Sequence, residues 1–173
     1  MVLSQKQWRN IFLFCLGLFL GTAFCMKWLE TLFIYRGEIF TIIGLEIVYP
    51  AQKVMDILYR SDQTVLTLLK SHLYFDFAFM IGAYGGIASL LMMARSRITH
   101  IIFNRLLLFL AVAQLIAWGC DILENLYLLD WMKNKTDIRP SFSGYHFVVM
   151  VKWVLALGGA LLSISVLLLK RKE

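Results

Sequence analysis

The chain has 173 residues, of which 60% are hydrophobic and 16% are charged. Soluble domains average about 45–50% apolar and about 25% charged residues, so this composition excludes an ordinary soluble domain and indicates an integral membrane protein. The net charge of +6 does not indicate nucleic acid as a partner, because Lys and Arg gather at the ends of apolar segments instead of forming one basic stretch.

Four long apolar segments are each about 20 residues or more, the length that a membrane-spanning helix requires. They predict an all-α, polytopic membrane protein with a four-transmembrane-helix bundle and a single membrane domain over 1–173. We expect the first helix to be retained, because no good signal-peptidase site follows it. The expected helices are about 10–30, 73–94, 104–130 and 145–169.

The segment 36–71, between the first two predicted helices, shows a different pattern. Charged residues alternate there with apolar residues at helical spacing, which predicts amphipathic interfacial helices. A segment that packs over the mouth of the bundle is compatible with the same pattern. The apolar positions are Val54, Ile57, Leu58, Val65, Leu68 and Leu69.

The distribution of basic residues predicts the orientation of the chain. The short turn that contains Arg95, Arg97 and Arg105 and the basic tail at 170–172 fall on the same side as the amino terminus. Under the positive-inside rule, both termini are expected in the cytoplasm.

Polar residues inside the third apolar segment indicate a site. Asp121, Glu124 and Asn125 are spaced at i, i+3 and i+4, so they share one helix face, which Trp118 extends. A charge at the centre of a membrane helix costs roughly 2.5–3.5 kcal/mol and is a candidate functional residue by default.

The other helices carry polar groups at a similar depth, toward the outer leaflet. We therefore expect Asp76, Asp121 and Glu124 to act as acid/base groups or as ligands of a divalent cation such as Mg²⁺, Ca²⁺ or Mn²⁺. The expected ligand is a membrane lipid or a lipid-like molecule. Its further contacts are expected from Asn125, Lys152, His146, Tyr84 and Trp118.

Two other functions remain open at this point. The acids can pair with Lys152 and Lys27 in a non-catalytic structural or accessory protein, since buried ion pairs can fix helix register. An ion or proton pathway is disfavoured because the inner half has few polar groups. The sequence does not decide whether the protein is an enzyme, or whether it forms a homo-oligomer or joins a partner membrane protein.

A resemblance adds to this interpretation. Three stretches of the chain are similar to a pattern in small bacterial four-helix membrane proteins of uncharacterised function. They are the run Tyr74-Phe75-Asp76-Phe77, the pair Tyr84-Gly85 and the run Asp121–Asn125. Gly44-Leu45-Glu46, shortly before Pro50, resembles the outer loop of the same family. The resemblance covers about residues 40–130 and implies a four-helix bundle in a bacterial inner membrane. A looser likeness to sterol-isomerase-like bundles carries over no residue.

Overall fold

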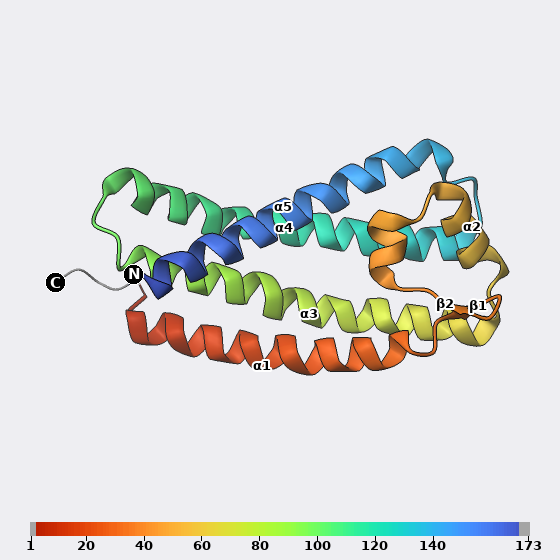
Figure 1. Ribbon diagram of the computed structural model, residues 1–173, viewed down its shortest axis with the longest axis horizontal. Coiled ribbons are helices and arrows are strands. Elements are labelled where there is room, and N and C mark those ends of the chain that lie inside the picture. Colours follow the sequence, from red (N-terminus) through yellow and green to blue (C-terminus); the bar gives the residue numbers. More distant parts are fainter. Residues whose placement is uncertain (1–2, 170–173) are drawn as a thin grey trace.

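The computed structural model describes residues 3–169 and shows an elongated helical bundle (Figure 1). Four of its helices are long and apolar enough to cross a membrane, which agrees with the all-α bundle expected from the sequence. They are α1 (Gln5–Glu30), α3 (Gln63–Arg95), α4 (Ile101–Asn134) and α5 (Arg139–Leu168).

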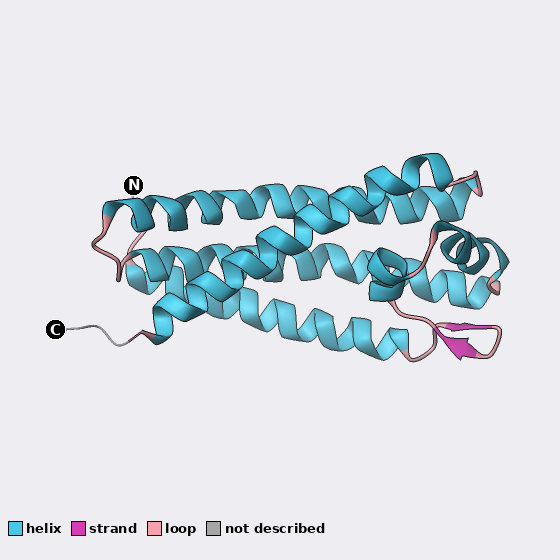
Figure 2. Ribbon diagram, turned by 45° about the horizontal axis from the view of Figure 1, so that its top comes forward, coloured by secondary structure: helices cyan, strands magenta, loops and turns pink. Residues whose placement is uncertain are grey.

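The connection between α1 and α3 folds onto one end of the bundle, opposite the start of α1 and the end of α5 (Figures 1 and 2). We call this the α2 end. The connection contains a two-stranded hairpin, a π-helical turn and a short helix. These are β1 (Ile34–Tyr35), β2 (Glu38–Ile39), η1 (Gly44–Val48) and α2 (Ala51–Arg60).

The bundle helices are longer than the apolar segments predicted. α3 begins at Gln63, so Val65, Leu68 and Leu69 lie on its first turns and not on a separate interfacial helix. α4 continues to Asn134. The next residue, Lys135, has a left-handed backbone conformation that terminates the helix. Polar residues extend these helices beyond their apolar segments, and hydropathy does not detect such extensions.

α2 is the one separate amphipathic helix in the segment 36–71, where amphipathic interfacial helices were expected. Its apolar residues Val54, Ile57 and Leu58 are at most 1% exposed. They pack into the core of the α2 end together with Leu73 and Trp131. Full burial of each such side chain stabilises the fold by about 1.5–3 kcal/mol. The apolar stripe of α2 therefore faces the bundle, while Lys53 lies on the exposed side.

The helices do not pack evenly around the bundle. α1 packs along α3, while α5 packs on α4 and α3. The approach of α1 to α3 requires a glycine, because a Cβ on Gly82 would lie 2.6 Å from the backbone nitrogen of Phe19. α1 and α5 are not packed along each other among the described elements, and they diverge toward the α2 end (Figure 1).

Candidate functional site

Lys152 is the centre of a buried polar cluster. Its Nζ lies 2.9 Å from Asp121 Oδ1, 2.5 Å from Glu124 Oε2 and 3.4 Å from Glu46 Oε2. The four residues are each at most 6% exposed. The ammonium therefore joins α5 to α4 and to η1. Such buried ion pairs are favourable only with good geometry, because each charged group loses its hydration on burial.

Two aromatic donors complete this cluster. The Tyr84 hydroxyl donates to Asp121 Oδ2 at 2.7 Å. The Trp153 indole Nε1 donates to Glu46 Oε2 at 3.1 Å. Both oxygens of Asp121 are thus occupied, by Lys152 and by Tyr84. Because buried polar groups must be hydrogen-bonded, these donors help to hold the acids in place.

Asp76 on α3 lies in a different environment. Its Oδ2 accepts a hydrogen bond of 2.8 Å from Asn125 Nδ2, which also contacts the Leu73 carbonyl oxygen at 3.4 Å. Asn125 lies one helical turn beyond Asp121 on α4. No residue in the described range 3–169 donates a hydrogen bond to Asp76 Oδ1. That oxygen is not sealed among protein atoms either, and Asp76 lines a cavity.

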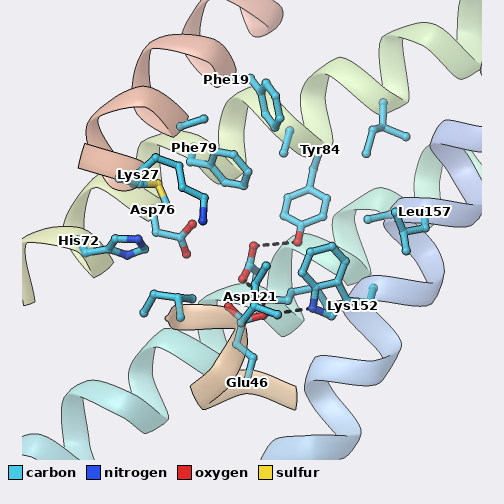
Figure 3. A pocket seen from close by; sticks show the side chains of 18 of the residues that line it. Phe19, Lys27, Glu46, His72, Asp76, Phe79, Tyr84, Asp121, Lys152 and Leu157 are labelled. Atoms are coloured by element: carbon cyan, nitrogen blue, oxygen red, sulfur yellow. Dashed lines mark hydrogen bonds and ion pairs between the residues drawn. The ribbon is translucent and has the colours of Figure 1, made fainter. Parts of the chain in front are cut away.

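The cavity has a volume of about 370 Å³ and lies where α1 and α5 diverge (Figure 3). Its polar end is lined by Asp76, Tyr84, Asp121, Lys152 and Glu46. Its remaining length is apolar and is formed by α1, α3 and α5, and it is partly open to the outside. The apolar lining includes Phe19, Ala23, Phe79, Ala83, Ile87, Ala156, Leu157 and Ala160.

A second polar group lies where α1 ends. Lys27 forms an ion pair with Glu30, whose other oxygen accepts a hydrogen bond of 3.0 Å from the backbone N–H of Ile42. His72 lies at the same end of the cavity, is 2% exposed and has no hydrogen-bond partner at Nδ1 among residues 3–169. Figure 3 shows its ring pointing toward Asp76, four residues further along α3.

The structure places the residues predicted from the sequence in three groups. Asp76, Asp121, Tyr84 and Lys152 line the cavity, while Glu124 and Asn125 lie behind it and hold its lining residues. Two residues expected to contact a ligand, Trp118 and His146, lie outside the cavity lining. Trp118 packs against the group formed by Met80, Tyr84 and Ala117, and His146 packs against the ring of Phe142 at 4.6 Å.

The metal site expected from Asp76, Asp121 and Glu124 is not formed. Residues 3–169 contain no group of three His, Cys, Asp or Glu side chains placed to hold one metal ion. The reason is visible in the contacts. The Lys152 ammonium occupies the space between Asp121 and Glu124, and the Asn125 amide occupies one oxygen of Asp76.

The polar lining residues that the sequence analysis named neither as site residues nor as ion-pair partners are Glu46, Trp153, His72 and Glu30. Glu46 has a signal that points to it, because it is an acid within the apolar stretch 39–48. The position of Trp153 next to Lys152 is a weaker signal. No sequence pattern brings η1 back onto α5, so this part of the site depends on the tertiary structure.

Comparison with known proteins found no family model, no curated protein and no solved structure that matches the chain.

Proposed function

We propose that this is an integral membrane protein that binds one single-chain, lipid-like amphiphile in the cavity between α1 and α5. The observation that carries the proposal is the form of the cavity. An apolar trough that is partly open between two helices ends at a buried polar cluster, which matches a molecule with one apolar chain and one polar group.

The outer surface of the bundle supports its location in a membrane. Large apolar side chains are exposed along the helices, and soluble monomers rarely expose large contiguous apolar patches. The Arg-rich turn between α3 and α4 supports an orientation with both termini in the cytoplasm of a bacterial cell, in the inner membrane. Exposed apolar residues include Phe14 (70%), Phe24 (68%), Phe109 (65%), Phe147 (70%) and Leu161 (66%).

The size of the cavity supports a single chain. On α1 the lining extends from Phe19 to Glu30, about 16 Å at 1.5 Å per residue. The volume of about 370 Å³ lies near the lower end of the range for small-molecule pockets, which is roughly 300–1,000 Å³. A chain can enter sideways from the lipid, because α1 and α5 are not packed along each other in the described structure.

The lining residues differ in what they offer to a bound ligand. Asp121 and Glu124 are both engaged by Lys152, so they position the lysine. Asp76 retains an oxygen that faces the cavity, which makes it the carboxyl best placed to contact the polar group or to act on it as an acid or base.

A structural role is the second candidate, and the ion pairs of Lys152 favour it. They join η1, α4 and α5, and buried pairs of this kind can fix the packing of helices without chemistry. Under this alternative, the cavity would bind no amphiphile selectively.

The test uses a substitution that fills the trough. Ala156→Phe places a ring into the apolar lining, whereas Val154→Phe adds a ring on the same helix at an exposed position (65%) outside the lining. The purified protein in phosphatidylcholine nanodiscs is titrated separately with dodecylamine, dodecanol and dodecanoate. Binding is measured by calorimetry against empty nanodiscs, and the thermal unfolding temperature is recorded.

We expect at least one of the three amphiphiles to bind wild type and Val154→Phe equally, with at least tenfold weaker binding to Ala156→Phe. If none of the three binds beyond its partition into empty nanodiscs, or if Ala156→Phe binds as well as wild type, the proposed function is wrong and the structural role stands.

A further inference from the structure

We infer that the polar group of the amphiphile is a protonated primary amine, held by Asp76, Glu46 and His72. This inference rests on the proposed function and specifies the class of its ligand. It follows from the charges and the unused hydrogen-bond acceptors at the polar end of the cavity.

The first observation is an imbalance of charge among the lining residues. Four carboxyl groups and two ammonium groups line the polar end. Each ammonium already has an acid partner, since Lys27 pairs with Glu30 and Lys152 pairs with Asp121. Glu46 shares Lys152 with Asp121 and Glu124, and Asp76 forms no ion pair within residues 3–169. The two ammonium groups therefore do not balance the acids, and a cation would offset the remaining negative charge in this apolar environment.

The second observation is where the remaining acceptors lie. Asp76 uses Oδ2 to accept from Asn125, and Glu46 uses Oε2 to contact Trp153 and Lys152. Asp76 Oδ1 and Glu46 Oε1 receive no hydrogen bond from residues 3–169 and are not sealed among protein atoms. Each of these carboxyl groups is therefore anchored through one oxygen and offers the other to a ligand.

The third observation is independent of the acids. His72 is 98% buried, lines the same cavity and lacks a hydrogen-bond partner at Nδ1 among the described residues. Nδ1 is sealed among protein atoms, whereas Nε2 is neither sealed nor hydrogen-bonded within residues 3–169, so a ligand in the cavity can reach His72 at Nε2. His72 and Asp76 are spaced at i, i+4 on α3 and thus share one face (Figure 3).

These groups match the donors of a primary ammonium. An alkylammonium has three N–H donors and no acceptor. Asp76 Oδ1, Glu46 Oε1 and the acceptor nitrogen of a neutral His72 provide three acceptors. A carboxylate head group would instead lie next to two unused carboxylate oxygens.

The experiment compares head groups on one chain. Dodecylamine, dodecanol and dodecanoate are titrated into the protein in phosphatidylcholine nanodiscs at pH 7, with empty nanodiscs as the blank. We expect dodecylamine to bind at least tenfold more tightly than dodecanol, and dodecanoate to bind most weakly. Asp76→Asn should reduce the preference for the amine over the alcohol to less than threefold.

Asp130→Asn is the matched control, because it makes the same change at an exposed acid on α4 outside the cavity. It should retain the full preference for the amine. Where Asp76→Asn does not fold, Glu46→Gln gives the same test, and it should also lower the preference. Asp76→Glu should retain most of it, because the charge is kept.

The outcomes separate the two proposals. Equal binding of amine and alcohol, or tighter binding of dodecanoate, overturns the amine inference while the proposed amphiphile site stands. An amine preference that survives both Asp76→Asn and Glu46→Gln also overturns it. If no amphiphile binds, both proposals fail.

Discussion

Replacement of Lys152 by methionine should destabilise the bundle strongly. The substitution keeps an unbranched side chain of similar length but removes the only ammonium within 4 Å of Asp121, Glu124 and Glu46 in the described structure. Breaking a buried ion pair by removing one partner typically costs about 3–5 kcal/mol, because the other charge is left without compensation. Three carboxyl groups share this lysine, so we expect a value at the upper end of that range.

The loss should appear in thermal unfolding. For a chain of 150–250 residues, 1 kcal/mol corresponds to a shift of about 2–4 °C, so a loss near 5 kcal/mol in Lys152→Met should lower the unfolding temperature by roughly 10–20 °C. Lys133→Met is the control, because Lys133 is exposed and forms no ion pair among residues 3–169. Its effect should stay within about 0.5 kcal/mol.

A triple variant tests the cause of the loss. If uncompensated charge is responsible, neutralising the two nearest acids in Lys152→Met/Asp121→Asn/Glu124→Gln should recover most of the lost stability, although each acid substitution alone should destabilise. The free energy of unfolding is measured in mixed micelles for all variants. The reasoning is refuted if Lys152→Met loses less than about 1 kcal/mol, or if the triple variant is no more stable than Lys152→Met.

Two further predictions concern other parts of the chain. Gly86→Ala should stabilise the fold by about 0.5–1 kcal/mol, because its Cβ would make only ordinary contacts and alanine favours the helix. Gly82→Ala should destabilise it, because its Cβ would lie 2.6 Å from the Phe19 backbone nitrogen. The free energies of unfolding of both variants test this pair of predictions, and a change of the same sign in both would contradict it. The Arg139 guanidinium holds the pKa of the exposed Asp137 carboxyl below its ordinary value of 3.8, so this contact stabilises the folded state above pH 3.8 and is lost as the pH falls through the lowered pKa. Wild type should therefore unfold at a higher temperature than Asp137→Asn at pH 7, and this difference should vanish near pH 2. A difference in unfolding temperature that does not depend on pH would contradict the assignment.

The four bundle helices could be predicted because each carries an apolar segment longer than about 20 residues. The polar cluster could also be located in part. Asp121 and Lys152 are charged residues within apolar segments, where an unpaired charge has a high free-energy cost. Because the two residues also lie at a similar depth, the sequence predicts that they pair. What the sequence did not define is the rotation of each helix, which decides whether a polar residue faces the cavity.

His146 illustrates this limit. It lies six residues before Lys152 on α5, which is a rotation of about 240° at 3.6 residues per turn, so the two side chains face different neighbours. His146 and Lys152 therefore lie in the same half of α5 but on different faces of the helix. Trp118 is three residues before Asp121 and packs, half-buried, against Met80 and Tyr84.

Glu46 could not be assigned to the site for another reason. Its position depends on the hairpin β1–β2, in which Arg36 and Gly37 both have positive φ values of 53° and 81°. This turn reverses the chain so that η1 returns to α5 and Trp153. Sequence periodicity describes local structure, whereas this contact joins residues 107 positions apart.

The dependence of α1 on a single neighbour has a consequence for synthesis. α1 packs along α3 and buries only Cys15 and Glu30, so this helix has no partner when it leaves the ribosome. About 65 further residues must be made before α3 is complete, which takes roughly 3–13 s at 5–20 residues per second. During this interval α1 lacks the helix on which it packs. The cavity wall that α1 forms with α3 can then be in place before α4 and α5, which carry Asp121 and Lys152, have been made.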